Sequence, residues 1–140
     1  MKKMNKKGFT LIELLAIIVI LAIIALIGTP IVTNIINTTR ISAAERTCDA
    51  VVEATNNFYS LSVMQNPNFG GASITFDGTK ATLTPAVEGD TLSTFDYKNT
   101  YPQAGTITIA QDGTVTWGEL TVNTYKCTAN AKAKYTCVKP

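Results

Sequence analysis

The stretch GFTLIELLAIIVILAIIALIGTP, residues 8–30, decides how this chain is organised. Between Leu11 and Ile27 its only polar residue is Glu13. A helix from Phe9 to Ile27 would rise about 28 Å, which is close to the thickness of the hydrocarbon core of a bilayer. The stretch is therefore predicted to form a helix that can span a membrane.

Glu13 is the unusual residue of this stretch. A charged side chain at the centre of a bilayer costs about 2.5–3.5 kcal/mol on insertion scales, and less near the end of a span. A carboxylate in this place is expected to have a cationic partner that exists only after processing or assembly. The alternative is a side chain that reaches back to the lipid headgroups.

The charges around the stretch predict its orientation. The next charged residue after Glu13 is Arg40, and four lysines precede the stretch: Lys2, Lys3, Lys6 and Lys7. This bias leaves the N-terminus in the cytoplasm and the remainder of the chain outside. An ordinary secretory signal peptide fits poorly, because the apolar run is long, contains Glu13 and is followed by no A-x-A site. A plain signal-anchor would explain the lysines and the span, but neither Gly8-Phe9 nor Glu13.

The motif at residues 8–13, Gly-Phe-Thr-Leu-Ile-Glu, closely resembles the class III signal of type IV prepilins and pseudopilins. The resemblance implies that a prepilin peptidase removes the leader, residues 1–8, by cutting between Gly8 and Phe9, and then N-methylates Phe9. It also implies that Glu13 pairs with the new α-amino group at Phe9 of a neighbouring subunit and so sets the assembly register. The resemblance covers about residues 1–45.

Pilins of this kind usually bend near the end of the apolar helix, and here Gly28 and Pro30 match that place. Glycine lacks a Cβ and proline lacks an N–H, so both weaken local helical structure. We expect a kink near Pro30. A functional hinge and a simple kink at the end of the span are both consistent with these residues.

Composition excludes several classes of function. The chain has no histidine, which removes histidine-based catalytic triads, general bases and metal ligands. A chain that begins at Phe9 would carry eight basic and ten acidic side chains, a balance that does not support a general nucleic-acid binder. We expect no enzymatic activity, cofactor or metal. An extracytoplasmic hydrolase is the disfavoured alternative.

Helical periodicity resumes after Pro30 and continues to about residue 62. The pattern predicts an amphipathic helix whose apolar side packs against the C-terminal half of a globular domain, residues 31–140. The residues expected on that side are Ala44, Cys48, Val51, Val52, Thr55, Phe58, Tyr59 and Ser62.

The breaker cluster NPNFGG, residues 66–71, ends the helix, and the chain beyond it is rich in strand formers. The loop over residues 85–102 should contribute Leu92, Phe95 and Tyr97 to the core. We predict an α+β fold in which the long helix packs on one small antiparallel sheet, as in type IV pilins. The expected strands cover residues 74–76, 81–83, 106–110, 114–117, 120–127 and 134–138.

The three cysteines, Cys48, Cys127 and Cys137, allow three pairings, each of which leaves one thiol. Many type IV pilins carry a disulfide-bounded C-terminal loop, so the resemblance favours Cys127–Cys137. Cys48 would then be a small buried hydrophobic residue. A bridge from Cys48 to either C-terminal cysteine is the rival.

Basic and aromatic residues gather near the C-terminus, and such a patch could contact DNA. Lysines on exposed strands are more often only a solvated face, so DNA contact is unsupported. The residues concerned are Tyr125, Lys126, Lys132, Lys134, Tyr135 and Lys139.

The sequence thus predicts a structural subunit of a type IV pilus-like filament. It would wait in the cytoplasmic membrane, be cut by prepilin peptidase, and be assembled by pilus machinery into a helical homo-oligomer on the cell surface. Within the same family, the alternative is a pseudopilin of a type II secretion or DNA-uptake machine. A monomeric membrane-anchored binding domain is the alternative from another class.

Overall fold

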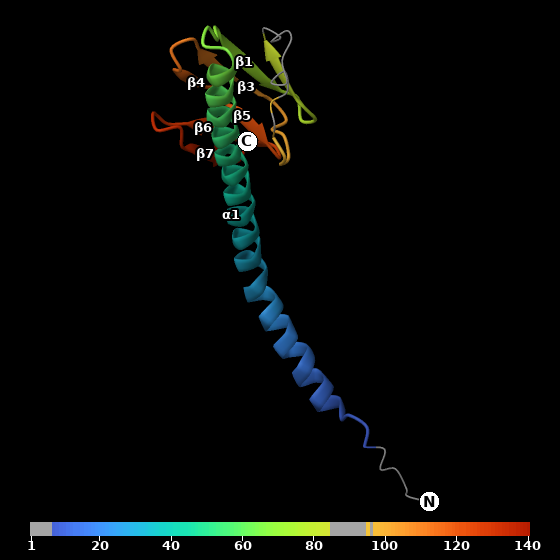
Figure 1. Cartoon of the computed structure of the whole chain (residues 1–140). Helices are drawn as coiled ribbons and strands as arrows, with labels where there is room; N and C mark the ends of the chain where they lie inside the picture. The colour runs from blue at the N-terminus through green and yellow to red at the C-terminus, as the bar shows by residue number, and fades with distance from the viewer. Residues whose placement is uncertain (1–6, 85–94, 96) are drawn as a thin grey trace, which may run out of the picture. The chain divides into compact units, whose positions relative to one another are not determined.

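The computed structural model describes residues 7–84, 95 and 97–140. Four residues named in the predictions lie outside the described residues: Lys2, Lys3, Lys6 and Leu92. The chain divides into two compact units, Met1–Thr38 and Thr39–Pro140. One helix, α1 (Leu11–Gln65), passes through both units, and all the strands belong to the second (Figure 1).

The helix α1 has 55 residues and continues through Pro30 without a break. It begins two residues later than expected, at Leu11 rather than Phe9, and ends at Gln65 rather than near residue 62. It ends there because Pro67 disfavours the helical conformation of Asn66, the residue before it. The Asn66 side chain then accepts a hydrogen bond from the Asn68 backbone N–H at 3.0 Å, which closes a turn.

Within the second unit, α1 buries one stripe of side chains. Their spacing alternates between three and four residues, which keeps them on one side of the helix and confirms the predicted amphipathic pattern. Val52 and Tyr59, which were also expected there, are only partly buried. The buried residues are Ala44, Cys48, Val51, Thr55, Phe58 and Ser62.

The described part of the chain contains seven antiparallel strands, which form two sheets in the orders β2-β1-β3-β4 and β5-β6-β7. The predicted hairpins at residues 74–83 and 106–117 are both present as β1-β2 and β3-β4. The strands are β1 (Gly71–Phe76), β2 (Ala81–Thr84), β3 (Gly105–Ala110), β4 (Val115–Trp117), β5 (Leu120–Val122), β6 (Tyr125–Ala129) and β7 (Tyr135–Val138).

The predicted α+β layout, a long helix packed with antiparallel strands, is confirmed, but these strands form two sheets where one was expected. The chain leaves the first sheet after Trp117 and enters the second at Leu120, and the isolated bridge between Ala104 and Thr121 links the two ladders. Gly118 lies at the crossing, where a Cβ would overlap the carbonyl oxygen of Thr106. Close backbone approach of this kind requires glycine.

The single strand predicted for residues 120–127 was wrong, because it contains a tight turn. Asn123 and Thr124 both have positive φ, 49° and 72°, and they reverse the chain between β5 and β6. Asparagine tolerates this conformation better than most residues. The Thr124 N–H donates to Oε1 of Gln103 at 3.2 Å, which ties the turn to the preceding loop.

The core of the second unit lies between the buried stripe of α1 and the inward faces of the strands. Aromatic rings fill it: the Phe58 ring centroid lies 6.1 Å from that of Phe69 and 6.2 Å from that of Phe95. Phe95 and Tyr97 are buried, as predicted for the loop before β3. Because α1 and the sheets share this core, cysteines on helix and strands can meet within it.

Candidate functional site

The N-terminal candidate site begins with the exposed, non-helical residues Gly8 and Phe9. Phe9 is 81% exposed, and a Cβ at Gly8 would meet nothing within 4 Å. The Gly8–Phe9 bond therefore lies in an open segment two residues before α1. None of the described residues packs over the bond, so a peptidase could reach it without displacing them.

Thr10 and Glu13 cap the start of the helix. The Thr10 backbone N–H donates to Oε2 of Glu13 at 3.0 Å, and the Glu13 N–H donates to Oγ1 of Thr10 at 3.3 Å. This reciprocal pair is a capping box, which satisfies N–H groups that have no acceptor in the first turn. This capping box was not predicted, although its signal, a threonine followed three residues later by a glutamate, is present in the sequence.

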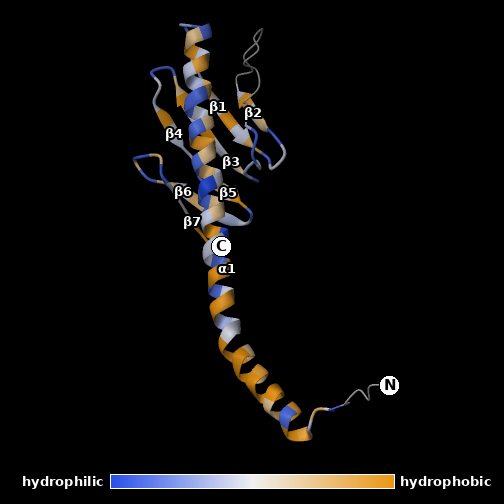
Figure 2. Cartoon of the chain, turned by 60° about the horizontal axis from the view of Figure 1, so that its bottom comes forward, coloured by the Kyte–Doolittle hydropathy of each residue, from blue (hydrophilic) through white to orange (hydrophobic). Residues whose placement is uncertain are grey.

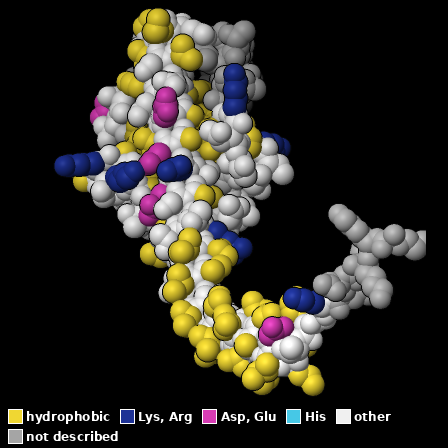
Figure 3. Space-filling model, turned by 90° about the horizontal axis from the view of Figure 1, so that it is seen from below, with side chains coloured by type: hydrophobic (Ala, Val, Ile, Leu, Met, Phe, Trp, Pro, Cys, Tyr) yellow, Lys and Arg dark blue, Asp and Glu magenta, His cyan; other side chains and the backbone are white. Residues whose placement is uncertain are grey.

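The apolar part of α1 in the first unit exposes its side chains on all sides. Every leucine, isoleucine and valine between residues 11 and 36 is exposed, from 88% for Leu11 to 43% for Ile36. Figures 2 and 3 show this segment as almost entirely hydrophobic, with one acidic group near its start. By length and composition it is sufficient to cross a membrane.

Gly28 and Pro30 lie inside the continuous helix, close to two threonines that bond back to the helix. The Thr29 Oγ1 donates to the Ala25 carbonyl oxygen at 2.7 Å, and the Thr33 Oγ1 donates to that of Thr29 at 3.0 Å. Such bonds often accompany helix bending, and Pro30 removes a backbone donor in the same turn. The kink and the hinge stay predictions.

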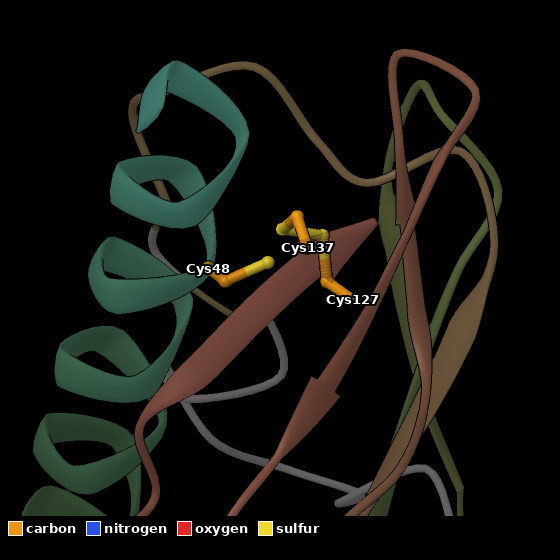
Figure 4. Close-up of side chains that lie close together, drawn as sticks. All are labelled: Cys48, Cys127 and Cys137. Carbon is orange, nitrogen blue, oxygen red and sulfur yellow. A yellow bond between two sulfur atoms is a disulfide. The ribbon is translucent and has the colours of Figure 1, made fainter. Parts of the chain in front are cut away.

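A second candidate site is the cysteine cluster, formed by Cys48 on α1, Cys127 on β6 and Cys137 on β7. The two strand cysteines are direct partners in the β6-β7 ladder, and a disulfide joins them across a Cα–Cα distance of 4.0 Å. Cys48 is a buried free thiol. All three Sγ atoms lie within 4.8 Å of one another, and the Cys48 sulfur points toward the disulfide (Figure 4).

Around this cluster, polar contacts join α1 to β7 and to Lys134, the residue before β7. The Cys137 backbone N–H donates to Oε1 of Glu45 at 3.3 Å, and the Lys134 Nζ lies 2.8 Å from Oδ2 of Asp49. Burial, and to a smaller extent the charges of Asp49 and Glu45, raises the pKa of the Cys48 thiol to about 12. The thiol is thus protonated at neutral pH.

The chemistry of this cluster is that of a thiol beside a disulfide. Soft metal ions bind cysteine as thiolate, and two of the three sulfurs are held in the Cys127–Cys137 bond. Only a reduced chain would offer three sulfur ligands. The cysteine cluster of the described chain is therefore suited to thiol–disulfide chemistry.

The basic and aromatic C-terminal patch does not form a stacking surface. Tyr125 and Tyr135 are buried, and the Tyr135 hydroxyl donates to the Gly118 carbonyl oxygen at 2.8 Å. Lys134 is paired with Asp49, and the Lys126 Nζ lies 3.8 Å from Glu119. Bases could not stack on either tyrosine, so this arrangement gives no support to DNA contact.

A comparison with protein families identifies the N-terminal segment. Residues 3–29 match the prokaryotic N-terminal methylation motif. No curated protein and no solved structure matches the chain. The match covers the basic leader, Gly8, Phe9, Glu13 and most of the apolar helix, and it points to a structural rather than a catalytic protein. Together with the long helix and antiparallel sheets, it supports a type IV pilin- or pseudopilin-like protein that carries a class III signal peptide.

Proposed function

We propose that this chain is a structural subunit of a type IV pilus-like extracellular filament, assembled through its N-terminal apolar helix. The observation that carries the proposal is the coincidence of the methylation motif at residues 3–29 with a helix whose apolar side chains are all exposed over residues 11–36. A folded chain leaves so much apolar surface open only where a membrane or other copies cover it.

The precursor would first be held in the cytoplasmic membrane by this helix. The leader, residues 1–8, stays on the cytoplasmic side, and the unit Thr39–Pro140 lies outside. Prepilin peptidase cuts between Gly8 and Phe9 and methylates the new amino group. The open conformation of this bond in the chain supports its role as the cleavage site.

Assembly then exchanges lipid for neighbouring subunits around the apolar helix. In the finished filament, which stands in water, keeping a leucine or isoleucine side chain buried rather than exposed contributes about 1.5–3 kcal/mol, and residues 14–36 carry many of them. The assembly machinery extracts each subunit from the membrane, and the packed helices form the filament core. The helix Leu14–Ile36 provides the cohesion, while the second unit forms the outer surface.

Glu13 would give this packing its register. The Glu13 carboxylate accepts a hydrogen bond from the Thr10 N–H of the same subunit at 3.0 Å, and its other oxygen can accept a further bond. The α-amino group of Phe9 in the neighbouring subunit is the cation proposed for that second bond. Since this group exists only after cleavage, unprocessed chains would not compete for sites in the filament.

Intact mass and N-terminal sequencing of the mature protein from its native host test the proposal. We expect a chain that begins at N-methylated Phe9, found in sheared surface filaments. Gly8→Leu is the matched variant: a Cβ at residue 8 meets nothing within 4 Å among the described residues, so loss of cleavage would reflect the peptidase. A wild-type chain that keeps residues 1–8 in a host with active peptidase would contradict the proposal and favour a monomeric membrane anchor.

The alternative role is that of a pseudopilin in a type II secretion or DNA-uptake machine. The N-terminal motif is common to both classes, and no described residue separates them. A deletion strain distinguishes the two: loss of surface filaments supports the pilus subunit, whereas loss of protein secretion or of DNA uptake with filaments intact supports the pseudopilin.

A further inference from the structure

The cysteine cluster contains one more sulfur than its disulfide requires. Cys48, Cys127 and Cys137 are all buried, at 0%, 0% and 3% exposure, and their Sγ atoms lie within 4.8 Å of one another. They come from one helix and two strands of the same compact unit (Figure 4). A third cysteine that merely filled space would not need its sulfur to face a disulfide.

We propose that the cysteine cluster is an internal thiol–disulfide exchange site, through which the disulfide can move from the β6-β7 hairpin to a bond between α1 and one of these strands. This inference does not rest on the filament function. It concerns the second unit alone, and it would hold for a pilin, a pseudopilin or a membrane anchor.

The exchange is a balanced isomerisation. The Cys48 thiol gives its proton to solvent, and the thiolate attacks one disulfide sulfur. A bond forms between Cys48 and the attacked cysteine while the Cys127–Cys137 bond breaks. The released thiolate takes up a proton. No electron leaves or enters the chain, so the step needs neither an oxidant nor a reductant.

The surroundings of Cys48 make this exchange slow at neutral pH. Burial and the acidic residues Asp49 and Glu45 hold the thiol in its protonated form, and Lys134 offsets part of this by pairing with Asp49. Burial, and to a smaller extent interaction with Cys48, raises the pKa of the Tyr97 and Tyr135 hydroxyls. Because only the thiolate attacks, the rate should rise about tenfold per pH unit below about pH 12.

The two disulfide arrangements connect different parts of the unit. The Cys127–Cys137 bond spans a sequence separation of 10 and stays within one hairpin. A bond from Cys48 would span 79 residues to Cys127 or 89 to Cys137 and would link the helix covalently to the C-terminal sheet. The Glu45 contact to the Cys137 N–H at 3.3 Å already holds these segments together.

Two variants test the proximity directly. In the full chain in detergent micelles, Cys127→Ser leaves Cys48 with Cys137, and Cys137→Ser leaves Cys48 with Cys127. Under glutathione disulfide, at least one variant should lose both free thiols as an intramolecular disulfide, with release of two glutathiones per chain. The same variants with Cys48→Ser should form none. If neither variant forms the bond, the proposal is wrong.

The wild-type chain tests the exchange without any substitution. After incubation at a chosen pH, the protein is quenched in acid, unfolded and alkylated, and trypsin then places the three cysteines in separate peptides, residues 47–80, 127–132 and 135–140. We expect the label on Cys48 at neutral pH. Label should also appear on Cys127 or Cys137, and the rate of its appearance should rise about tenfold for each pH unit. This rate should not depend on protein concentration.

Two results would overturn the proposal in the wild-type chain. Label that stays on Cys48 alone at every pH would show that the disulfide does not move. A rate that increases with protein concentration would show exchange between chains instead. The Cys48→Ser chain is the control, because it should take up no label at any pH.

Discussion

Thr10 and Glu13 bind each other at the first turn of α1: the Thr10 N–H lies 3.0 Å from the Glu13 carboxylate, and the Glu13 N–H lies 3.3 Å from the Thr10 hydroxyl oxygen. The same carboxylate is therefore a helix cap within the subunit and the proposed partner of a neighbour's amino group. These two roles need different chemistry. Capping needs only an acceptor, whereas the pairing with an ammonium group gains most from a negative charge.

Substitution at these two residues separates the roles. Glu13→Gln keeps an acceptor for the Thr10 N–H but removes the charge, so helix content should persist while filament assembly weakens. Loss of a charge-assisted hydrogen bond costs about 1.5–3 kcal/mol, or about 10- to 150-fold in association. The measurement is the yield of sheared filament together with circular dichroism of the membrane form.

Thr10→Ala is the matched control, because it removes the hydroxyl of the cap and retains the charge. It should lower helix stability by about 0.5–2 kcal/mol and leave assembly nearly unchanged. Should Glu13→Gln assemble as well as wild type while Thr10→Ala does not, the capping role alone would explain Glu13.

A matched pair of isoleucines separates folding from assembly. Ile74 in β1 is fully buried, whereas Ile31 in the first unit is 54% exposed. Ile74→Ala should lower the free energy of unfolding of the second unit by about 2–5 kcal/mol, because it leaves a cavity. Ile31→Ala should leave that unfolding unchanged and weaken filament contacts by about 2 kcal/mol.

Denaturant unfolding of the full chain in micelles and filament stability in detergent measure the two effects. If Ile31→Ala destabilises the second unit as much as Ile74→Ala does, the exposed part of α1 is not an assembly surface.

The sequence predicted those parts of the fold that rest on local pattern. The buried stripe from Ala44 to Ser62 follows helical periodicity, and the hairpins at residues 74–83 and 106–117 follow strand alternation and glycine turns. The division into two sheets was not predicted, because strand alternation shows where strands form and not which strands pair with one another. The turn at Asn123-Thr124 was missed because it lacks glycine.

The candidate sites divide in the same way. The motif at residues 8–13 is local, so its residues could be named from the sequence alone. The approach of Cys48 to the Cys127–Cys137 disulfide depends on how α1 packs against β6 and β7, and cysteine spacing left three pairings open. The burial of Tyr125 and Tyr135 likewise follows from packing, which the sequence pattern does not show.

The Cys127–Cys137 disulfide should stabilise the second unit by closing a short loop in the unfolded chain. In the chain-entropy model, a loop of about ten residues contributes about 3 kcal/mol. We expect the chain with all three cysteines replaced by serine to have a free energy of unfolding lower by this amount than the Cys48→Ser chain. Urea unfolding of both chains in micelles measures the difference. The Cys48→Ser background prevents re-pairing. A loss below about 1 kcal/mol would indicate that the unfolded chain is already constrained near β6 and β7.

The β1-β2 turn should give the unit an acid-dependent contribution to stability. Asp77 Oδ1 accepts from the Thr79 N–H at 2.9 Å, the Lys80 N–H at 2.9 Å and the Thr79 hydroxyl at 2.8 Å. The backbone bonds from Thr79 and Lys80, with the hydroxyl bond, lower the pKa of Asp77 from its ordinary value of 3.8. Since the folded pKa is the lower one, this stabilisation is present above the unfolded pKa and is lost as pH falls through the folded pKa.

Asp77→Asn tests that sign, because the amide keeps an acceptor oxygen but does not titrate in this range. The wild-type chain should lose more stability than Asp77→Asn between about pH 5 and about pH 2, so the two unfolding curves should converge in acid. Asp77→Ala, which loses the bonds at every pH, should be less stable than Asp77→Asn throughout. Equal acid slopes for wild type and Asp77→Asn would mean that the turn persists without the charge, and that other carboxylates govern the acid limb.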